Sequence, residues 1–319
     1  MEDIKITAQA ENNSMEDRQN SPCQKASKKK KYNLLFIIIG SVFLLHGLSL
    51  LLPFLWMLLT SVKGLLDFQN SFLGWPKTFV WENYTKIFKL LRIEDARVDG
   101  IYVYNVFDML LNSLTLALFK PFFGLLSVIL CSYVVAKYDF GIRKLLYNIN
   151  VFVMVIPIVG SLANTLLIYK QLHIYNNLLL YIILPGGPFG FNFLLLYGAF
   201  KRIPDSYSEA VFLDGGGHFT VFFRVVIPMM MPTFIALYIL AFIGAWNDYS
   251  ASLIFLPSTP TLAYGLYVFQ YDAAKYEATL PEILAGFAIC SIPSVALFCS
   301  FQKVITKSLT VGGLSSAPA

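Results

Sequence analysis

Residues 201–232 lie between two long apolar runs and read KRIPDSYSEAVFLDGGGHFTVFFRVVIPMMMP. Three consecutive glycines, beginning at Gly215, permit a sharp turn and predict the end of a helix. Ser206, followed three residues later by Glu209, fits a capping box at a helix start. The pattern therefore predicts a short helix over residues 207–214, tethered at both ends to apolar segments.

The composition around this stretch is that of a membrane protein. Apolar residues make up 57% of the chain, charged residues only 13%, and the mean hydropathy is +0.64. An ordinary soluble domain carries about 25% charged residues. Several apolar runs extend over about 18 residues or more, which is the length a helix needs to cross a bilayer. The predicted fold class is an all-α membrane protein.

Six membrane-spanning helices are expected. They cover residues 33–60, 109–136, 145–168, 178–200, 229–255 and 283–301. The third is interrupted by Pro157, Gly160 and Asn164. Such breaks persist in a membrane only where protein or a cavity satisfies the freed backbone groups. The third span is therefore expected to face other protein or a pathway, and not lipid.

Basic residues set the expected orientation, because Lys and Arg stay in the cytoplasm. With the N-terminus inside, fifteen of the 24 basic residues lie in cytoplasmic segments and eight lie outside. Both termini are therefore predicted to be cytoplasmic, with a disordered basic tail over residues 1–32 and a cytoplasmic C-terminal tail over residues 308–319. The long loop over residues 61–108 then lies outside. Its aromatic residues suit either an interfacial anchor or a cap that contacts a soluble partner.

The short helix falls between the fourth and fifth spans, in the cytoplasmic loop over residues 201–228. Its apolar side chains are too many for a solvated loop and need a partner surface; they are Tyr207, Ala210, Val211, Phe212 and Leu213. Ala210 is small enough to let that surface approach the backbone. An amphipathic connector lying on lipid headgroups is the alternative.

This loop resembles the "EAA" loop of the permease subunits of ABC importers. The motif reads E-A-A, three residues, G, nine residues, I, one residue, L-P. The matching positions are Glu209, Ala210, Val211, Gly215, Val225, Ile227 and Pro228. Three of them, Val211, Val225 and Ile227, depart from the motif but stay apolar. The resemblance implies a coupling helix that docks on a cytoplasmic ATPase through Glu209, Ala210, Val211, Asp214, Gly215 and Pro228.

Other segments resemble the MalG-like subunits of carbohydrate importers, in the same order and spacing. They are FLWM (54–57), TSVK (60–63), WENY (81–84), NS (112–113), GAWNDY (244–249) and SLTVGG (308–313). The resemblance implies a permease domain over residues 33–307 in a bacterial cytoplasmic membrane. It also implies three protein partners: a second, MalF-like permease subunit, an ABC ATPase dimer that holds ATP and Mg, and an extracytoplasmic sugar-binding protein.

Polar residues inside the spans are candidates for a substrate pathway, because they are costly in lipid. Lys120 lies about 15 Å into the second span at 1.5 Å per residue. It would serve as a pathway cation for an acidic or heavily hydroxylated sugar, or else snorkel or pair with Asp248. The segment Trp246, Asn247, Asp248 and Tyr249 offers an aromatic plane beside amide and carboxylate groups, which suits a sugar. Helix packing is the alternative.

The remaining patterns exclude several classes. No GxxxxGK[ST] motif is present, so ATP hydrolysis is expected in a separate subunit. The three histidines lie far apart in the sequence, so no metal site is predicted. No nucleophile–base pair is visible, so no enzymatic activity is predicted. The charge of +5 is explained by membrane orientation and needs no nucleic acid. An autonomous secondary transporter or channel, and an ABC permease for a non-sugar solute, stay as alternatives.

Overall fold

The computed structural model describes residues 34–97, 100–156, 160–184, 186–275 and 277–311. The chain forms two compact units, the first ending at Pro53 and the second beginning at Phe54. Helix α2 (Leu34–Ser61) runs through this boundary, and its side chains from Phe36 to Leu52 are exposed. The tail predicted over residues 1–32 lies outside the described residues.

Four described helices are long and apolar enough to cross a membrane. They cover Phe36–Ser61 within α2, Val106–Lys137, His218–Trp246 and Leu280–Thr306. Each has 26 residues or more, which is roughly 40 Å or more at 1.5 Å per residue. Long helices are therefore confirmed for the first, second, fifth and sixth of the predicted spans.

The third predicted span is divided into two helices. Helix α6 (Arg143–Val155) ends before the break, and α7 (Ser161–Gln171) begins after Gly160, which has a positive φ of 77°. Pro157 lies outside the described residues. The expectation that Asn164 interrupts the span is wrong, because α7 continues through it.

The fourth predicted span is also not one helix. Helix α8 (Leu178–Ile183) ends after six residues, and α9 (Phe191–Arg202) starts only after a non-helical stretch. This stretch contains Gly186, Gly187, Pro188 and Gly190. Glycine and proline are the weakest helix formers, which gives the physical reason for the break.

The fifth span begins earlier and ends earlier than residues 229–255. It starts with α11 (His218–Thr220), passes through a π-helical segment η1 (Val221–Val226) and continues as α12 (Ile227–Trp246). Pro228 lies in the first turn of α12, directly after η1, and therefore inside the continuous helical span and not at its start. A second π-helical segment, η2 (Ala251–Phe255), follows separately.

The last part of the chain holds one helix that the hydropathy pattern did not predict. This is α13 (Leu262–Tyr271), whose Thr261 side chain accepts a hydrogen bond from the Tyr264 N–H at 3.3 Å. Helix α14 (Leu280–Val311) then extends beyond the predicted span in both directions. Residues 308–311 of the predicted C-terminal tail are part of this helix, and residues 312–319 lie outside the described part.

The loop between α2 and α5 (Val106–Lys137) corrects the all-α prediction. It contains helices α3 (Leu65–Asn70) and α4 (Glu82–Leu90), and then an antiparallel hairpin. The hairpin consists of β1 (Arg92–Arg97) and β2 (Gly100–Asn105). The β2 sequence is rich in β-branched and aromatic residues, which favour strands.

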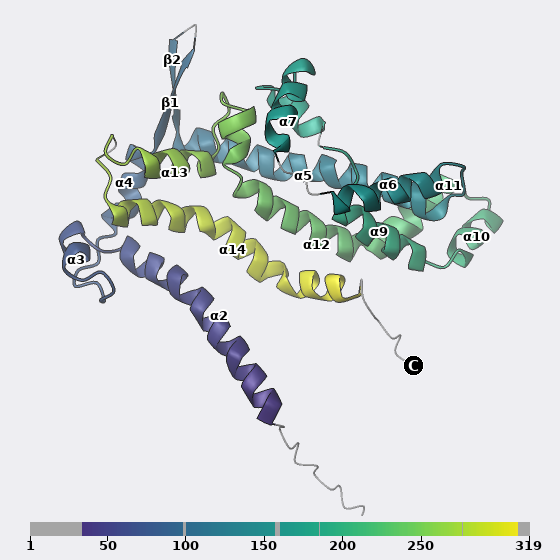
Figure 1. Cartoon of the computed structure of the whole chain (residues 1–319), viewed down its shortest axis with the longest axis horizontal. Coiled ribbons are helices and arrows are strands. Elements are labelled where there is room, and N and C mark those ends of the chain that lie inside the picture. Colours follow the sequence, from purple (N-terminus) through teal and green to yellow (C-terminus); the bar gives the residue numbers. More distant parts are fainter. Residues whose placement is uncertain (1–33, 98–99, 157–159, 185, 276, 312–319) are drawn as a thin grey trace, which may run out of the picture. The chain divides into compact units, whose positions relative to one another are not determined.

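Helix α5 is the centre of the second unit. Figure 1 shows it running beside α12, with the hairpin at its beginning and α10 (Ser206–Leu213) near its end. One buried cluster lies toward the hairpin and includes Met109, Trp246 and Phe269, and a second lies toward α10 and includes Tyr133, Phe200 and Val226. The two ends of α5 therefore pack in separate apolar clusters.

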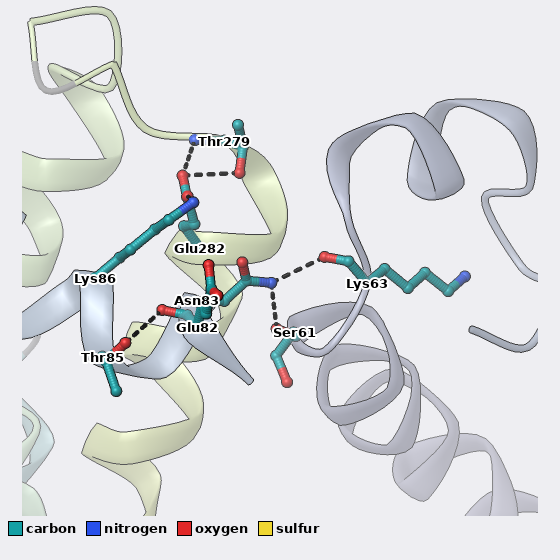
Figure 2. Close-up of polar contacts among 8 residues, drawn as sticks. All are labelled: Ser61, Lys63, Glu82, Asn83, Thr85, Lys86, Thr279 and Glu282. Atoms are coloured by element: carbon teal, nitrogen blue, oxygen red, sulfur yellow. Dashed lines mark hydrogen bonds and ion pairs between the residues drawn. The ribbon is translucent and has the colours of Figure 1, made fainter. Parts of the chain in front are cut away.

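A polar junction connects α4 to the end of α2 and to α14. The Asn83 side-chain amide donates to the carbonyl oxygens of Ser61 and Lys63, both at 2.8 Å (Figure 2). On the other side, Lys86 forms an ion pair with Glu282 at 3.0 Å. Asn83 is buried, so these two hydrogen bonds take the place of bonds to water and hold the loop in place.

We predict that Asn83→Ala destabilises this junction. The change leaves two carbonyl oxygens without their donor, and each buried unsatisfied group costs about 1–3 kcal/mol. Thermal unfolding of the detergent-purified chain, followed by circular dichroism, should show a lower midpoint. Thr85→Ala is the control, because the Thr85 hydroxyl donates to the Glu82 carbonyl within its own helix and does not bridge the junction among the described residues (Figure 2). Equal midpoints for the two variants would contradict the prediction.

Candidate functional site

Helix α10 (Ser206–Leu213) is a short helix with an exposed apolar surface. Tyr207 and Phe212 are exposed, and Leu213 is 88% exposed. Val211 is half-buried and packs on the cluster at the end of α5. Because Val211 is the side that contacts the chain, the other apolar side chains are left for a partner surface.

The start of α10 differs from the predicted capping box. The helix begins at Ser206 and its N-cap is Asp205, with no side-chain hydrogen bond to the first turn. The Glu209 and Ser208 N–H groups instead donate to the Asp205 carbonyl at 3.0 and 2.9 Å. Asp205 has helical backbone angles, so the extended geometry that a capping side chain needs is missing. The capping-box prediction is therefore wrong.

The end of α10 is formed by the glycines, as predicted. Gly215 has a positive φ of 77°, and the Gly216 N–H donates to the Val211 carbonyl at 2.8 Å. Asp214 caps the helix with its own N–H bonded to Ala210. A β-carbon at Gly216 would lie 2.5 Å from Val211 Cγ1, so the turn requires glycine there as well.

The predicted docking residues fall at different places around α10. Glu209 and Ala210 are exposed on the helix, and Asp214 is exposed at its end. Pro228 lies outside this helix, in the first turn of α12. The structure thus gathers Glu209, Ala210 and Asp214 on one exposed element.

A cavity of about 560 Å³ lies beside the middle of α5. Its walls come from α5, from residues 186–190 before α9 together with the first turn of α9, and from α12. It contains both Lys120 and Asp248, the two charged residues predicted for a pathway. Glycines make up much of the wall: Gly124, Gly186, Gly187, Gly190 and Gly244. Their lack of side chains leaves backbone groups accessible from the cavity.

Lys120, which lines this cavity, binds the buried Tyr181. Its ammonium donates to the Tyr181 hydroxyl at 2.6 Å and lies 4.2 Å from the centre of the same ring. No ion pair with Asp248 is formed within the described residues, although both line the cavity. Asp248 instead accepts hydrogen bonds from the N–H groups of Ser250 and Ala251, at 2.9 and 3.2 Å.

The segment from Trp246 to Tyr249 is divided among three environments. Trp246 is buried, and its indole N–H donates to the Cys290 carbonyl at 2.9 Å. Asn247 and Tyr249 line a different cavity of about 430 Å³, where Tyr249 stacks on Tyr267 at 4.5 Å. Only Asp248 joins Lys120. The four residues therefore do not form one site.

Sequence reasoning missed the segment over residues 186–193 and its support. The Gly190 N–H donates to Asn150 Oδ1 at 2.6 Å, and Gly190 has a φ of 140° that favours glycine. Asn150 is fully buried in α6. The Gly-Gly-Pro sequence inside an apolar run was the available signal for this break. Tyr181 carried no such signal, because its contact with Lys120 joins two distant helices.

Comparisons with known proteins agree with this arrangement. The chain is 27% identical to the arabinooligosaccharides transport system permease protein AraQ of Bacillus subtilis, over 89% of the chain and 97% of that protein. It is 25% identical to the diacetylchitobiose uptake system permease protein NgcG of Streptomyces coelicolor, over 86% of the chain and 87% of that protein. A crystal structure of a bacterial ABC transporter involved in the import of the acidic polysaccharide alginate has a chain with a similar fold. The TM-score is 0.68 at 19% identity, over 84% of this chain and 96% of that one.

Long apolar helices, a glycine-lined cavity and an exposed apolar helix at one end define a membrane transport subunit. Residues 128–311 match the family described as binding-protein-dependent transport system inner membrane component. This match covers more than half of the chain and includes α10 and the cavity walls formed by residues 186–193 and by α12, but it begins after Lys120. The chain belongs to this family, and its resemblance to a transporter permease is confirmed.

We predict that Gly216→Ala loosens the end of α10, because the new methyl group collides with Val211. Overpacking of this kind costs about 1–3 kcal/mol. Amide hydrogen exchange over residues 206–220 should become faster in this variant. Gly217→Ala is the matched control, since a β-carbon there meets no atom within 4 Å and its φ is −100°. Identical exchange in both variants would count against the prediction.

Proposed function

We propose that the chain forms half of the translocation pathway of an ATP-driven importer for a sugar or oligosaccharide. The observation that carries the proposal is α10, an exposed apolar helix placed near the end of the same α5 that lines the cavity. Family membership supports the transport role. The carbohydrate cargo is supported by relatives whose names specify arabinooligosaccharides, diacetylchitobiose and maltodextrin.

In this proposal the chain crosses a bacterial cytoplasmic membrane six times, with both termini inside. The pairs α6–α7 and α8–α9 act as the third and fourth crossings. Non-helical backbone at membrane depth is tolerated where it lines a cavity, and residues 186–190 do so. The basic residues favour this orientation, which places α10 in the cytoplasm and the hairpin outside.

The proposed complex contains the chain, a second permease subunit, a pair of ATPase subunits and an extracytoplasmic sugar-binding protein. ATP and Mg are bound by the ATPase pair, and this chain binds no cofactor. The second permease completes the pathway, because α5, α12 and residues 186–193 supply only part of its wall. Alternating access follows when the ATPase pair closes on ATP and moves the docked helices.

Helix α10 docks on the ATPase in this scheme. Phe212 and Leu213 supply apolar contact area, and Ala210 lets the partner approach the backbone. Glu209 and Asp214 add carboxylates that can pair with basic groups at the rim. Val211 seats the helix on the rest of the chain and Gly215 ends it, while Pro228 lies within the following span.

The cargo passes the cavity that holds Lys120 and Asp248. The Lys120 ammonium and the Asp248 carboxylate can bond sugar hydroxyls as donor and acceptor. Exposed backbone groups along residues 186–193 add further partners. Asn247 and Tyr249, which follow the end of α12, line a second cavity and contribute from there, while Trp246 packs in the core.

Co-isolation tests the proposal directly. The tagged chain, extracted from its native membrane, should retain a distinct ATPase and a second permease subunit. Transport by the purified chain alone in liposomes would contradict the proposal and establish an autonomous transporter or channel. The cargo is tested by measuring ATP hydrolysis by the complex, with its binding protein, in the presence of a broad panel of saccharides. If no saccharide stimulated hydrolysis, the result would favour an importer for a non-sugar solute.

We predict that Lys120→Met lowers the saccharide uptake rate of the reconstituted complex by about tenfold. A hydrogen bond from a charged group contributes about 1.5–3 kcal/mol, and each 1.4 kcal/mol is a factor of ten. Lys170→Met is the matched control, because Lys170 also lies over a tyrosine ring, that of Tyr175 at 5.0 Å, but does not line this cavity. Unchanged uptake in Lys120→Met would remove this lysine from the pathway.

A further inference from the structure

Two consecutive residues at the end of α5 contact the segments on both sides of α10. Lys137, the last residue of α5, donates to the Ile203 carbonyl at 2.5 Å and to Asp205 Oδ1 at 2.7 Å. Ile203 and Asp205 directly precede α10. The ammonium group therefore joins the end of α5 to the entrance of the exposed helix.

The next residue, Tyr138, reaches the other side of α10. Its hydroxyl lies 3.1 Å from Nδ1 of His218, the first residue of α11. Phe212 of α10 packs against the same imidazole, with ring centres 5.0 Å apart. Tyr138 is itself packed edge-on against Tyr133 of α5, at 5.8 Å. The exit of α10 is thus also connected to α5.

The Lys137 contact differs from an ordinary surface ion pair in the burial of its lysine. The Lys137 side chain is only 10% exposed, whereas Asp205 is 78% exposed. The lysine ammonium therefore loses most of its contact with water, and hydrogen bonds to a carbonyl and a carboxylate replace it. A cation at the C-terminal end of a helix is also favoured by the helix dipole. The hydrogen bond from Lys137 lowers the pKa of Asp205, so the carboxylate stays charged at neutral pH.

The same helix connects this contact to the cavity. Helix α5 is continuous over Val106–Lys137, and Lys120 lies seventeen residues before Lys137. At 1.5 Å per residue, about 25 Å of helix separates the two lysines. An element that is held at α10 and also forms a wall of the cavity can carry a displacement from one to the other.

We propose that Lys137 and Tyr138 form a clamp that makes α10 and α5 move together, so that displacement of α10 by the ATPase reshapes the cavity. The clamp rests on the proposed function, because it needs a partner that moves α10. Lys137 and Tyr138 are positioning residues in this account. They touch neither the cargo nor, in their present contacts, the exposed apolar side chains of α10.

A purely structural anchor and a transmitting clamp differ in what they change. An anchor would affect ATPase binding or the stability of the complex. A clamp leaves the complex assembled and alters the response of the cavity to ATP. The experiment must therefore measure a change in the accessibility of the cavity, and it must work without knowledge of the cargo.

The test uses the complete complex, with the four native cysteines of this chain replaced and one cysteine placed at Ala241, which lines the cavity. The rate of maleimide labelling is measured with and without ATP plus vanadate. Asp205→Lys and Lys137→Asp should each reduce the ATP-dependent change in labelling rate by at least about fivefold. This is the smallest effect that typical coupling between two sites produces. Combining the two should restore it, because the opposite charges then meet again. Tyr138→Phe removes one hydroxyl and should give a smaller loss.

Asp139→Lys is the matched control. Asp139 pairs with Arg143, also at 2.7 Å and next to the end of α5, and this pair involves none of the described residues beside α10. This variant should keep the full response. The clamp is overturned if the single variants respond normally, if the double variant is not restored, or if the single variants lose the ATPase. Absence of an ATPase or of any ATP response in the parent complex would instead contradict the proposed function.

Discussion

The packing of α5 against α9 and α12 is the interaction on which the second unit depends. It places Lys120 at a cavity, Met109 in one apolar cluster and Tyr133 in another. Close approach matters at its beginning, because a β-carbon on Gly265 of α13 would lie 2.5 Å from the Met109 sulfur. A helix this apolar, held on several sides by protein, can span a membrane and still carry polar groups to defined positions.

The sequence predicts those parts of the fold that depend on local physics. Continuous apolar runs predict α2, α5, α12 and α14, since hydropathy alone decides whether a long helix is stable in lipid. The mean hydropathy of a run does not reveal the break between α8 and α9, because glycines and a proline lie there among apolar residues. Helix α13 and the hairpin were missed because both lie between spans, where hydropathy carries little information.

The candidate site divides in the same way. The exposed helix α10 was predictable, because Gly215 and the apolar residues before it lie within a few positions of each other. The start of α10 was not predictable, and no capping box forms there. Asp205 has helical backbone angles, and its side chain bonds to Lys137, which lies 68 residues away in the sequence. The run from Trp246 to Tyr249 looked like one site, but α12 ends at Trp246 and the following residues turn to different cavities. Contiguity in sequence is a poor guide where a helix ends.

The account joins an exposed helix, a long helix and a cavity into one transport subunit, and its central claim is that α10 receives the ATPase. A photoreactive amino acid at Leu213, which is 88% exposed, tests this claim in native membranes. Irradiation is predicted to attach the chain covalently to an ATPase subunit, whereas the same probe at Ile101 of the hairpin should give no such product. Attachment of the Leu213 probe to lipid alone would contradict the claim and assign α10 to the membrane surface.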